Sequence, residues 1–240
     1  MRLNQYIARA TGISRRKADE VIASKRVKVN GHPGNFSDQI QAHDVVELHE
    51  KGLWKNVSPQ DQSNEVILMY KPPGFMTTKS DPQGRRTIYE LLPQEYKRFN
   101  TAGRLDYNSE GLLVLSANGN TIFRLTHPKF KSQKKYLVGL SSVLTSQQIA
   151  RARSGDIVLD GYKLNPVTIE KGVISQYQYL NLESNLYWYN FTLSEGRNRQ
   201  IRKMCAMMNN PVQRLIRIAH GDYYLDSAIV RGGWRKVELT

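Results

Sequence analysis

The stretch from Gly103 to Leu115 contains the residue of this chain best suited to chemistry. Asp106 follows a Gly-Arg-Leu sequence, and Ser109 then leads into the apolar run that ends at Leu115. An apolar run after a polar turn predicts a buried strand. Asp106 would lie on a turn clamped by that strand, where a carboxylate can act as a nucleophile. The same residues suit a carboxylate that only closes a turn, and this stretch alone leaves both interpretations open.

Few other side chains offer reactive chemistry. The five histidines never fall at metal-ligand spacing, and Cys205 is the only cysteine. We therefore expect no metal site and no internal disulfide. The sequence has no glycine-rich phosphate loop and no dinucleotide fingerprint, so we expect no nucleotide cofactor. A carboxylate, tyrosines and arginines remain as candidates.

The charge balance of the chain indicates a polyanionic partner. Lys and Arg number 35 against 21 Asp and Glu, which gives a formal net charge of +14. The excess is clustered, with eight cations against two acids in residues 1–30, five against none in 124–136 and six against none in 197–217. A solvated face usually mixes both signs, so these clusters favour a phosphate-binding track. We expect the partner to be nucleic acid.

A membrane surface is the competing polyanion, and the sequence argues against it. No run of about 18 apolar residues is present, and no charged-then-apolar leader begins the chain. The basic residues lie among Gly and Asn turns and not along a strongly apolar helix. The single cysteine fits a reducing compartment. We expect a cytoplasmic protein without membrane attachment.

Composition predicts two domains of unequal size within the 240 residues, of which 40% are hydrophobic. Residues 1–50 are typical of two short helices, the second capped by Ser14, followed by strands around an Asn-Gly turn. Residues 51–64 have the composition of a linker. Residues 65–240 contain many strands and few helices, including one expected to be capped by Ser194. This pattern predicts an α+β fold with a mostly antiparallel sheet.

Four stretches in register resemble the ribosomal RNA pseudouridine synthases of the RsuA/RluB type. The central stretch is Gly103-Arg104-Leu105-Asp106, with Ser109 and Gly111-Leu112-Leu113 after it. The others are Lys71-Pro72-Pro73-Gly74, which we interpret as a rigid structural turn, Lys135-Tyr136-Leu137-Val138, and the segment from Glu195 to Arg202. The first fifty residues resemble the α-L RNA-binding domain first seen in a ribosomal small-subunit protein.

The resemblance implies an isomerisation that needs no cofactor. The bond from ribose to the uracil nitrogen breaks, the base turns, and it rejoins the sugar through ring carbon five. Asp106 would be the nucleophile, attacking either the sugar or the ring, and Arg202 would be its ionic partner. Arg199, placed on the same helical face, is the substitute partner. Tyr136 would stack on the target base, and Arg104 would hold the flipped-out nucleotide.

The resemblance also implies an RNA-binding surface and a class of target. In the small domain, the cations expected to contact RNA are Arg2, Arg15, Arg16, Lys17 and Lys28. We expect ribosomal RNA or an assembling ribosomal subunit as partner, with a uridine of the large-subunit RNA as target. A small-subunit target is the near alternative.

Two other classes of function compete with this one. A noncatalytic RNA-binding or ribosome-assembly factor would share the basic clusters but would not need Asp106, Tyr136 and Arg202 together. A glycosidase typically uses two carboxylates that flank the bond. Glu110 is the only acidic residue close to Asp106 in sequence, which gives that alternative little support.

Overall fold

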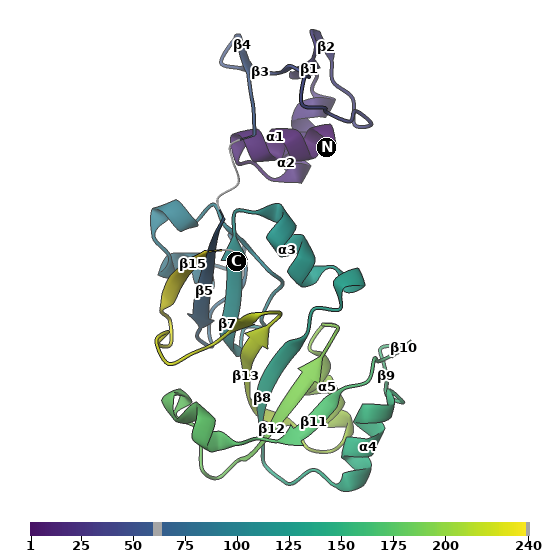
Figure 1. Cartoon of the computed structure of the whole chain (residues 1–240), viewed down its shortest axis with the longest axis vertical. Helices are drawn as coiled ribbons and strands as arrows, with labels where there is room; N and C mark the ends of the chain where they lie inside the picture. The colour runs from purple at the N-terminus through teal and green to yellow at the C-terminus, as the bar shows by residue number, and fades with distance from the viewer. Residues whose placement is uncertain (60–63, 239–240) are drawn as a thin grey trace. The chain divides into compact units, whose positions relative to one another are not determined.

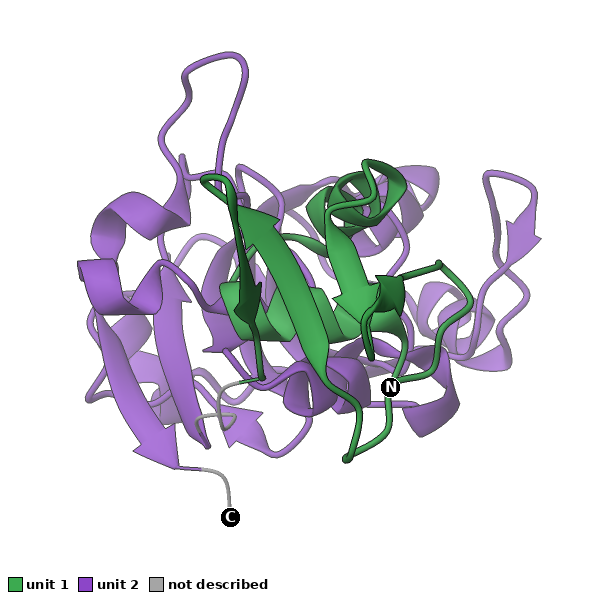
Figure 2. Cartoon of the chain, turned by 90° about the horizontal axis from the view of Figure 1, so that it is seen from above, with its two compact units in different colours: residues 1–63 green, residues 64–240 purple. Residues whose placement is uncertain are grey.

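The computed structural model describes residues 1–59 and 64–238, and the chain divides into two compact units (Figure 2). Unit 1 is Met1–Ser63 and unit 2 is Asn64–Thr240. The predicted linker 51–64 is wrong in part, because Leu53–Asn56 forms a strand paired within unit 1. Residues 60–63 of that predicted linker lie outside the described residues.

Unit 1 combines two helices with a four-stranded antiparallel sheet in the order β2-β1-β3-β4. Its elements are α1 (Leu3–Thr11), α2 (Arg15–Ala23), β1 (Val27–Val29), β2 (His32–Pro33), β3 (Val46–Glu50) and β4 (Leu53–Asn56). Ser14 caps α2 as predicted, since its side chain accepts a hydrogen bond from the backbone of Lys17 at 3.1 Å. Leu3 and Ile7 of α1 pack with Ile22 of α2 in the unit's core.

A nine-stranded sheet dominates unit 2 (Figure 1). Its main path runs β11-β12-β8-β13-β7-β5-β15, while β6 pairs with β7 and β14 with β13. Only the β13–β7 pairing is parallel among the described strands. The bounds are β5 (Glu65–Lys71), β6 (Asn100–Thr101), β7 (Glu110–Ser116), β8 (Lys134–Leu140), β11 (Thr168–Lys171), β12 (Tyr187–Leu193), β13 (Val212–His220), β14 (Tyr223–Tyr224) and β15 (Trp234–Glu238). The predicted α+β fold with a mostly antiparallel sheet is confirmed.

Helices and a small hairpin complete unit 2. They are α3 (Gly119–Thr126), α4 (Ser146–Ser154), α5 (Gln200–Met207), the 3-10 turns η1 (Ile88–Leu91), η2 (Gln94–Tyr96), η3 (Pro128–Phe130) and η4 (Ile174–Leu180), and the hairpin of β9 (Val158–Leu159) and β10 (Tyr162–Lys163). Within the described ranges, none of the helices is long and apolar enough to cross a membrane.

The central strands β8 and β13 are buried on both faces. Val138 and Leu215, register partners, join a cluster that includes Met204 of α5. Leu137 and Ile216, the next register pair, join a different cluster. Successive residues of a strand point to opposite faces, so the two clusters cover the two faces of the sheet. This double cover fixes the strands from which the site residues project.

The segment before α5 departs from the sequence prediction. Ser194 does not cap the helix, because α5 begins only at Gln200. The side chain of Gln200 instead holds the preceding loop, accepting from the backbone of Arg197 at 3.0 Å and donating to Glu195 at 2.8 Å. Residues 194–199 therefore form a loop held by hydrogen bonds from Gln200 and do not form a helical turn.

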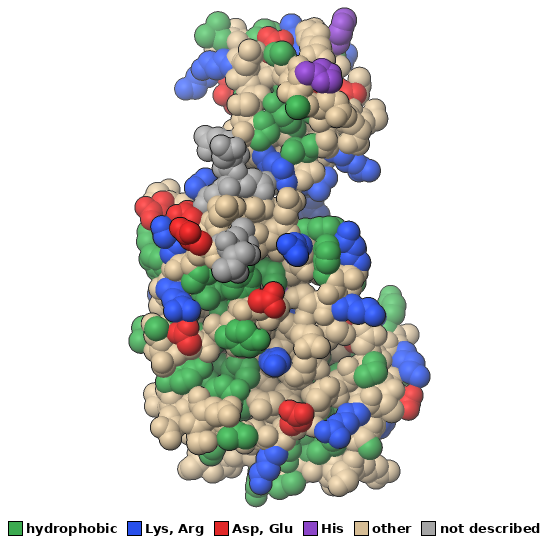
Figure 3. Space-filling view, viewed as in Figure 1, with side chains coloured by type: hydrophobic (Ala, Val, Ile, Leu, Met, Phe, Trp, Pro, Cys, Tyr) green, Lys and Arg blue, Asp and Glu red, His purple; other side chains and the backbone are tan. Residues whose placement is uncertain are grey.

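The surface gives a partial view of the charge distribution. On the face drawn in Figure 3, Lys and Arg side chains are scattered over unit 2 among apolar and acidic ones. A continuous basic track is therefore not visible on that face of unit 2.

Candidate active site

Asp106 lies on a turn that directly precedes the fully buried strand β7. Leu105, just before it, is buried, and Thr77 binds both its backbone carbonyl and its backbone amide. The hydroxyl of Thr77 donates to the Leu105 carbonyl at 2.9 Å and accepts from the Leu105 amide at 3.3 Å. The amide of Ser109 closes the turn on the Asp106 carbonyl at 3.1 Å. The Asp106 side chain, 30% exposed, is thus held still and remains reachable.

Lys71, at the end of β5, anchors the same turn from inside the protein. Its side chain is fully buried, and its ammonium donates to the carbonyls of Pro72, Tyr107 and Ser109 at 2.9, 3.3 and 2.8 Å. Burial lowers the pKa of Lys71 to about 8, an effect that the negative charges of Asp106 and Glu110 oppose. The Lys71–Gly74 stretch therefore positions the Asp106 turn. The signal in the sequence was a lysine at the end of an apolar strand.

Asp106 opens into a cavity of about 420 Å³. Arg104 and Asp106 line one wall, and the loop 195–199 with the start of α5 lines another. Tyr136 and Arg217 also line it, from the neighbouring strands β8 and β13. The cavity therefore unites segments that lie about a hundred residues apart in the chain.

Arg199, the substitute partner, is the arginine that meets the carboxylate. Its Nη1 lies 4.0 Å from Oδ2 of Asp106, and its side chain is 47% exposed. The residue has a left-handed backbone (φ 52°) and caps the N-terminus of α5 without belonging to the helix. The expectation that Arg199 and Arg202 share one helical face is therefore wrong. The backbone turn at Arg199 is what directs its side chain toward Asp106.

Arg202, the partner expected from the sequence, binds the turn and not the carboxylate. Its Nη2 donates to the Asn108 carbonyl at 2.9 Å and to the Ser109 hydroxyl at 3.3 Å. Among the described residues no ion pair within 4.0 Å joins Arg202 to Asp106, and Arg202 does not line the cavity. Burial lowers its pKa, the charge of Arg199 lowers it further, and the charge of Asp106 opposes both. The charges of Arg202 and Asp106 are thus close enough to interact. Arg202 also positions Asp106 by holding the turn that carries it.

Tyr136 and Arg104 both reach the cavity, as the resemblance required. Tyr136 is half-buried on β8, where its register partners are Phe191 on β12 and Arg217 on β13. Its ring packs against the apolar cluster beneath α5, which fixes the plane that it presents. Arg104 is exposed at the rim, beside Asp106. A rim cation and a fixed ring suit a pocket for an everted base.

Glu195 is the other carboxylate of this cavity, and it is occupied. It accepts from the backbone of Asn165 at 3.0 Å and from Gln200 at 2.8 Å, and it pairs with Arg197 at 3.4 Å. Glu110, the residue that the glycosidase alternative would need, does not line the cavity. The site therefore presents a single available carboxylate, that of Asp106.

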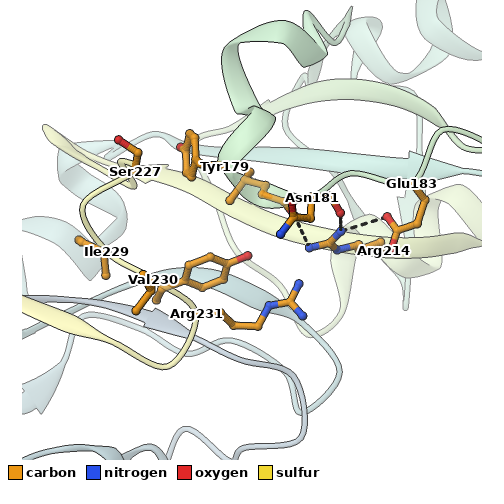
Figure 4. Close-up of a pocket in the computed structure, with 10 residues that line it drawn as sticks. Tyr179, Asn181, Glu183, Arg214, Ser227, Ile229, Val230 and Arg231 are labelled. Carbon is orange, nitrogen blue, oxygen red and sulfur yellow. Dashed lines mark hydrogen bonds and ion pairs between the residues drawn. The ribbon is translucent and has the colours of Figure 1, made fainter.

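Glu110 instead binds residues that line a second cavity, of about 350 Å³ (Figure 4). Arg214 and Arg231 pair with it at 2.6 and 2.9 Å, and the Tyr70 hydroxyl donates to it at 3.0 Å. Arg214 also pairs with Glu183 at 3.0 Å. Burial alone would lower the pKa of Arg214, but its hydrogen bonds and ion pairs with Glu110 and Glu183 raise it. Because every charge in this network is matched, the second cavity is a structural feature.

The RNA contacts expected in unit 1 are mostly solvent-accessible. Arg2, Arg15 and Arg16 are exposed, and Arg15 donates to Asn4 at 3.3 Å. Lys17 pairs with the exposed Glu20 at 2.7 Å. Lys28 is half-buried, with its ammonium 4.2 Å from the ring centre of Trp54. The chain offers no cluster of three or more His, Cys, Asp or Glu that could hold a metal, as far as its described residues go.

Comparison with known proteins bears on both units. A family model described as RNA pseudouridylate synthase matches residues 65–207, and an S4 domain model matches residues 1–46. The protein named ribosomal large subunit pseudouridine synthase B from Haemophilus influenzae is 35% identical over 99% of this chain, which spans 65% of that relative's length. Its namesake from Salmonella typhimurium is 31% identical over the whole chain, which spans 80% of it. A crystal structure of a pseudouridylate synthase matches with a TM-score of 0.66 and 29% identity, covering 99% of this chain and 96% of that one.

Proposed function

This chain belongs to the RNA pseudouridylate synthase family, and we propose that it isomerises a uridine of large-subunit ribosomal RNA to pseudouridine with Asp106 as nucleophile. The cavity is the observation that carries the proposal. It joins one available carboxylate, a fixed tyrosine ring and a rim arginine in one open space. Nothing else that the described residues offer matches the demands of this reaction so well.

The reaction conserves all atoms, so the protein has to supply only a nucleophile, positioning and a shaped pocket. The bond from C1′ to N1 breaks, a bond from C1′ to C5 forms, and the proton on C5 is replaced by one on N1. Asp106 provides the nucleophile, and the turn held by Lys71 and Arg202 keeps it in place. Arg199, whose Nη1 lies 4.0 Å from Oδ2 of Asp106, orients the carboxylate.

The base must leave its helix to reach this pocket. Tyr136 offers a ring already fixed by packing, on which an everted uracil can stack. Arg104 stands exposed at the rim, where the RNA backbone or the vacated stack would lie. The exposed cations of unit 1, which matches the S4 domain model, supply further phosphate contacts.

The names of the two relatives described above, both ribosomal large subunit pseudouridine synthase B, support a large-subunit target. The test is to map pseudouridine in large- and small-subunit ribosomal RNA, transcribed without modification and incubated with the purified chain. New pseudouridine in the large-subunit RNA alone is expected. New pseudouridine only in the small-subunit RNA would correct the target. RNA binding with no pseudouridine in either would support the noncatalytic assembly factor.

A further inference from the structure

Two arginines three residues apart on β13 have opposite surroundings. Arg214 lines the second cavity (Figure 4). Glu110, Glu183 and two backbone carbonyls satisfy its guanidinium group. Arg217 lines the cavity of Asp106 and is only 1% exposed. The only hydrogen bond that it donates in the described structure runs from Nε to the Leu112 carbonyl, at 2.8 Å. Its Nη2 is buried without a partner.

A buried guanidinium group with an unpaired donor is costly, so it needs an explanation. No carboxylate lies within ion-pair distance of Arg217 in the described part of the chain. Two nearby titratable groups, Lys134 and His220, are cationic and neutral respectively. Burial and the charge of Arg217 lower the pKa of Lys134, and burial with both cations lowers the pKa of His220 to about 3. Arg217 and Lys134 therefore both bring positive charge to the cavity.

The register of the sheet places Arg217 beside the ring on which the base would stack. Arg217 and Tyr136 are direct partners between β13 and β8, so both side chains rise from the same face. On the other side, β7 presents Gly111 opposite Arg217, with no side chain to intervene. A uracil resting on Tyr136 would have the guanidinium group of Arg217 at its edge.

We propose that Arg217 is a catalytic residue whose guanidinium group, which lines the Asp106 cavity, donates to O4 of the target uracil. This inference rests on the proposed function. If Asp106 attacks the sugar, the electron pair of the broken C1′–N1 bond spreads over N1, O2 and O4. If Asp106 attacks ring carbon six, the electron pair of the C5–C6 bond moves onto O4. In both routes negative charge grows on O4, where a buried cation stabilises it most.

The test combines an altered substrate with an altered protein. Single-turnover rates are measured on an RNA fragment that carries uridine or 4-thiouridine at the target position, with the full chain and its Arg217→Lys variant. Sulfur accepts a hydrogen bond more weakly than oxygen, and its intrinsic effect on bond breaking is the same for both proteins. We expect the uridine rate divided by the 4-thiouridine rate to be about tenfold smaller for Arg217→Lys than for the unaltered chain. The variant has already lost the charge-assisted hydrogen bond from Arg217 to position 4 of the base.

Arg214→Lys is the matched control, because it makes the same substitution on the same strand but on the opposite face. The uridine to 4-thiouridine rate ratio of Arg214→Lys should equal that of the unaltered chain. The uridine to 2-thiouridine rate ratio should be the same in all three proteins. An unchanged 4-thiouridine ratio in Arg217→Lys would overturn the inference while leaving pseudouridine formation by the unaltered chain intact. Absence of activity in the unaltered chain would instead overturn the proposed function.

A phosphate is the competing ligand for Arg217, and it predicts another result. Loss of a phosphate contact would weaken RNA binding and reduce the slope of log affinity against log salt concentration by about one. It would leave the uridine to 4-thiouridine rate ratio unchanged. If Arg217→Lys fails to fold, photo-crosslinking of 4-thiouridine in the Asp106→Asn complex replaces the kinetic test. A crosslink within β13 is expected, and crosslinks confined to residues outside the cavity would overturn the inference.

Discussion

The Nη1 atom of Arg199 lies 4.0 Å from the Oδ2 atom of Asp106, whereas Arg202 binds the turn that carries Asp106. The two arginines therefore divide two tasks. Arg199 faces the carboxylate from an exposed position, and Arg202 holds the backbone of Asn108 and the hydroxyl of Ser109 from a half-buried one. This division predicts different consequences for their removal.

Arg199→Met should lower the rate of isomerisation and leave stability unchanged, because an exposed ion pair contributes little to folding. Arg202→Met should lower the free energy of unfolding by ~1–3 kcal/mol, since it removes the charge-assisted hydrogen bonds to Asn108 and Ser109 that hold the turn. Urea denaturation and single-turnover rates on the same preparations measure both effects. Full activity in Arg199→Met, with inactive but fully stable Arg202→Met, would return the role of carboxylate partner to Arg202.

Gly111→Ala should force β7 away from β13. A Cβ at this position would lie 2.3 and 2.6 Å from the backbone oxygen and nitrogen of Arg217, and the backbone has φ +107°. We expect a loss of ~3 kcal/mol or more in the free energy of unfolding. The matched control is Gly84→Ala, where φ is +69° but the space is open, and it should cost only about 1 kcal/mol. Equal effects of both substitutions would refute the steric argument.

His220 should make the protein sensitive to acid. The imidazole is fully buried, with Nε2 2.9 Å from the Leu125 carbonyl. Burial, Arg217 and Lys134 lower its pKa from 6.5 to about 3. Between these two pH values the unfolded chain binds a proton that the folded chain does not, so stability falls as the pH falls.

The expected loss below pH 6.5 is at most about 1.4 kcal/mol per pH unit. His220→Gln keeps a donor for the Leu125 carbonyl and removes the titration. Urea denaturation at pH 7 and pH 5 should show a smaller loss in the variant than in the unaltered chain. If both proteins lost equal stability, His220 would not be the group responsible.

The cations at the start of α2 should contribute to RNA binding through charge alone. Replacing Arg15 and Arg16 by Gln in the full chain removes two exposed charges. We expect weaker binding to ribosomal RNA and a shallower dependence of affinity on salt, by up to about two in the logarithmic slope. Lys55→Gln on β4 removes an exposed cation from the same unit as a control. A salt slope unaffected by the double substitution would remove these arginines from the RNA contact.

Much of the fold could be predicted from the sequence because local patterns and tertiary packing agree. Ser14 caps its helix, and the apolar run after Ser109 is a buried strand. The strand Leu53–Asn56 was missed because it is exposed along its whole length and shows no apolar alternation. Its hydrogen bonds to β3 hold it in place, and amino-acid composition alone does not reveal such pairing.

The site was predictable only in outline. The motifs identified Asp106, Tyr136 and Arg104, and the structure brings all three to one cavity. The sequence placed Arg202 first and Arg199 second as the partner of Asp106, whereas Arg199 is the one within 4.0 Å of the carboxylate. A left-handed residue at the helix start does not show in helical periodicity. Arg217 lies in a strand beside apolar residues, where only the three-dimensional arrangement shows that its donor is unpaired.

The central claim is that the carboxylate of Asp106 is the nucleophile that starts the isomerisation. The most direct measurement compares Asp106→Asn with Asp222→Asn, whose carboxylate lines neither of the two cavities described above. The nearly isosteric change at Asp106 should leave thermal unfolding and RNA affinity unchanged while pseudouridine formation in purified ribosomal RNA falls below detection. Asp222→Asn should keep full activity. Pseudouridine formation by Asp106→Asn at the rate of the unaltered chain would contradict the claim.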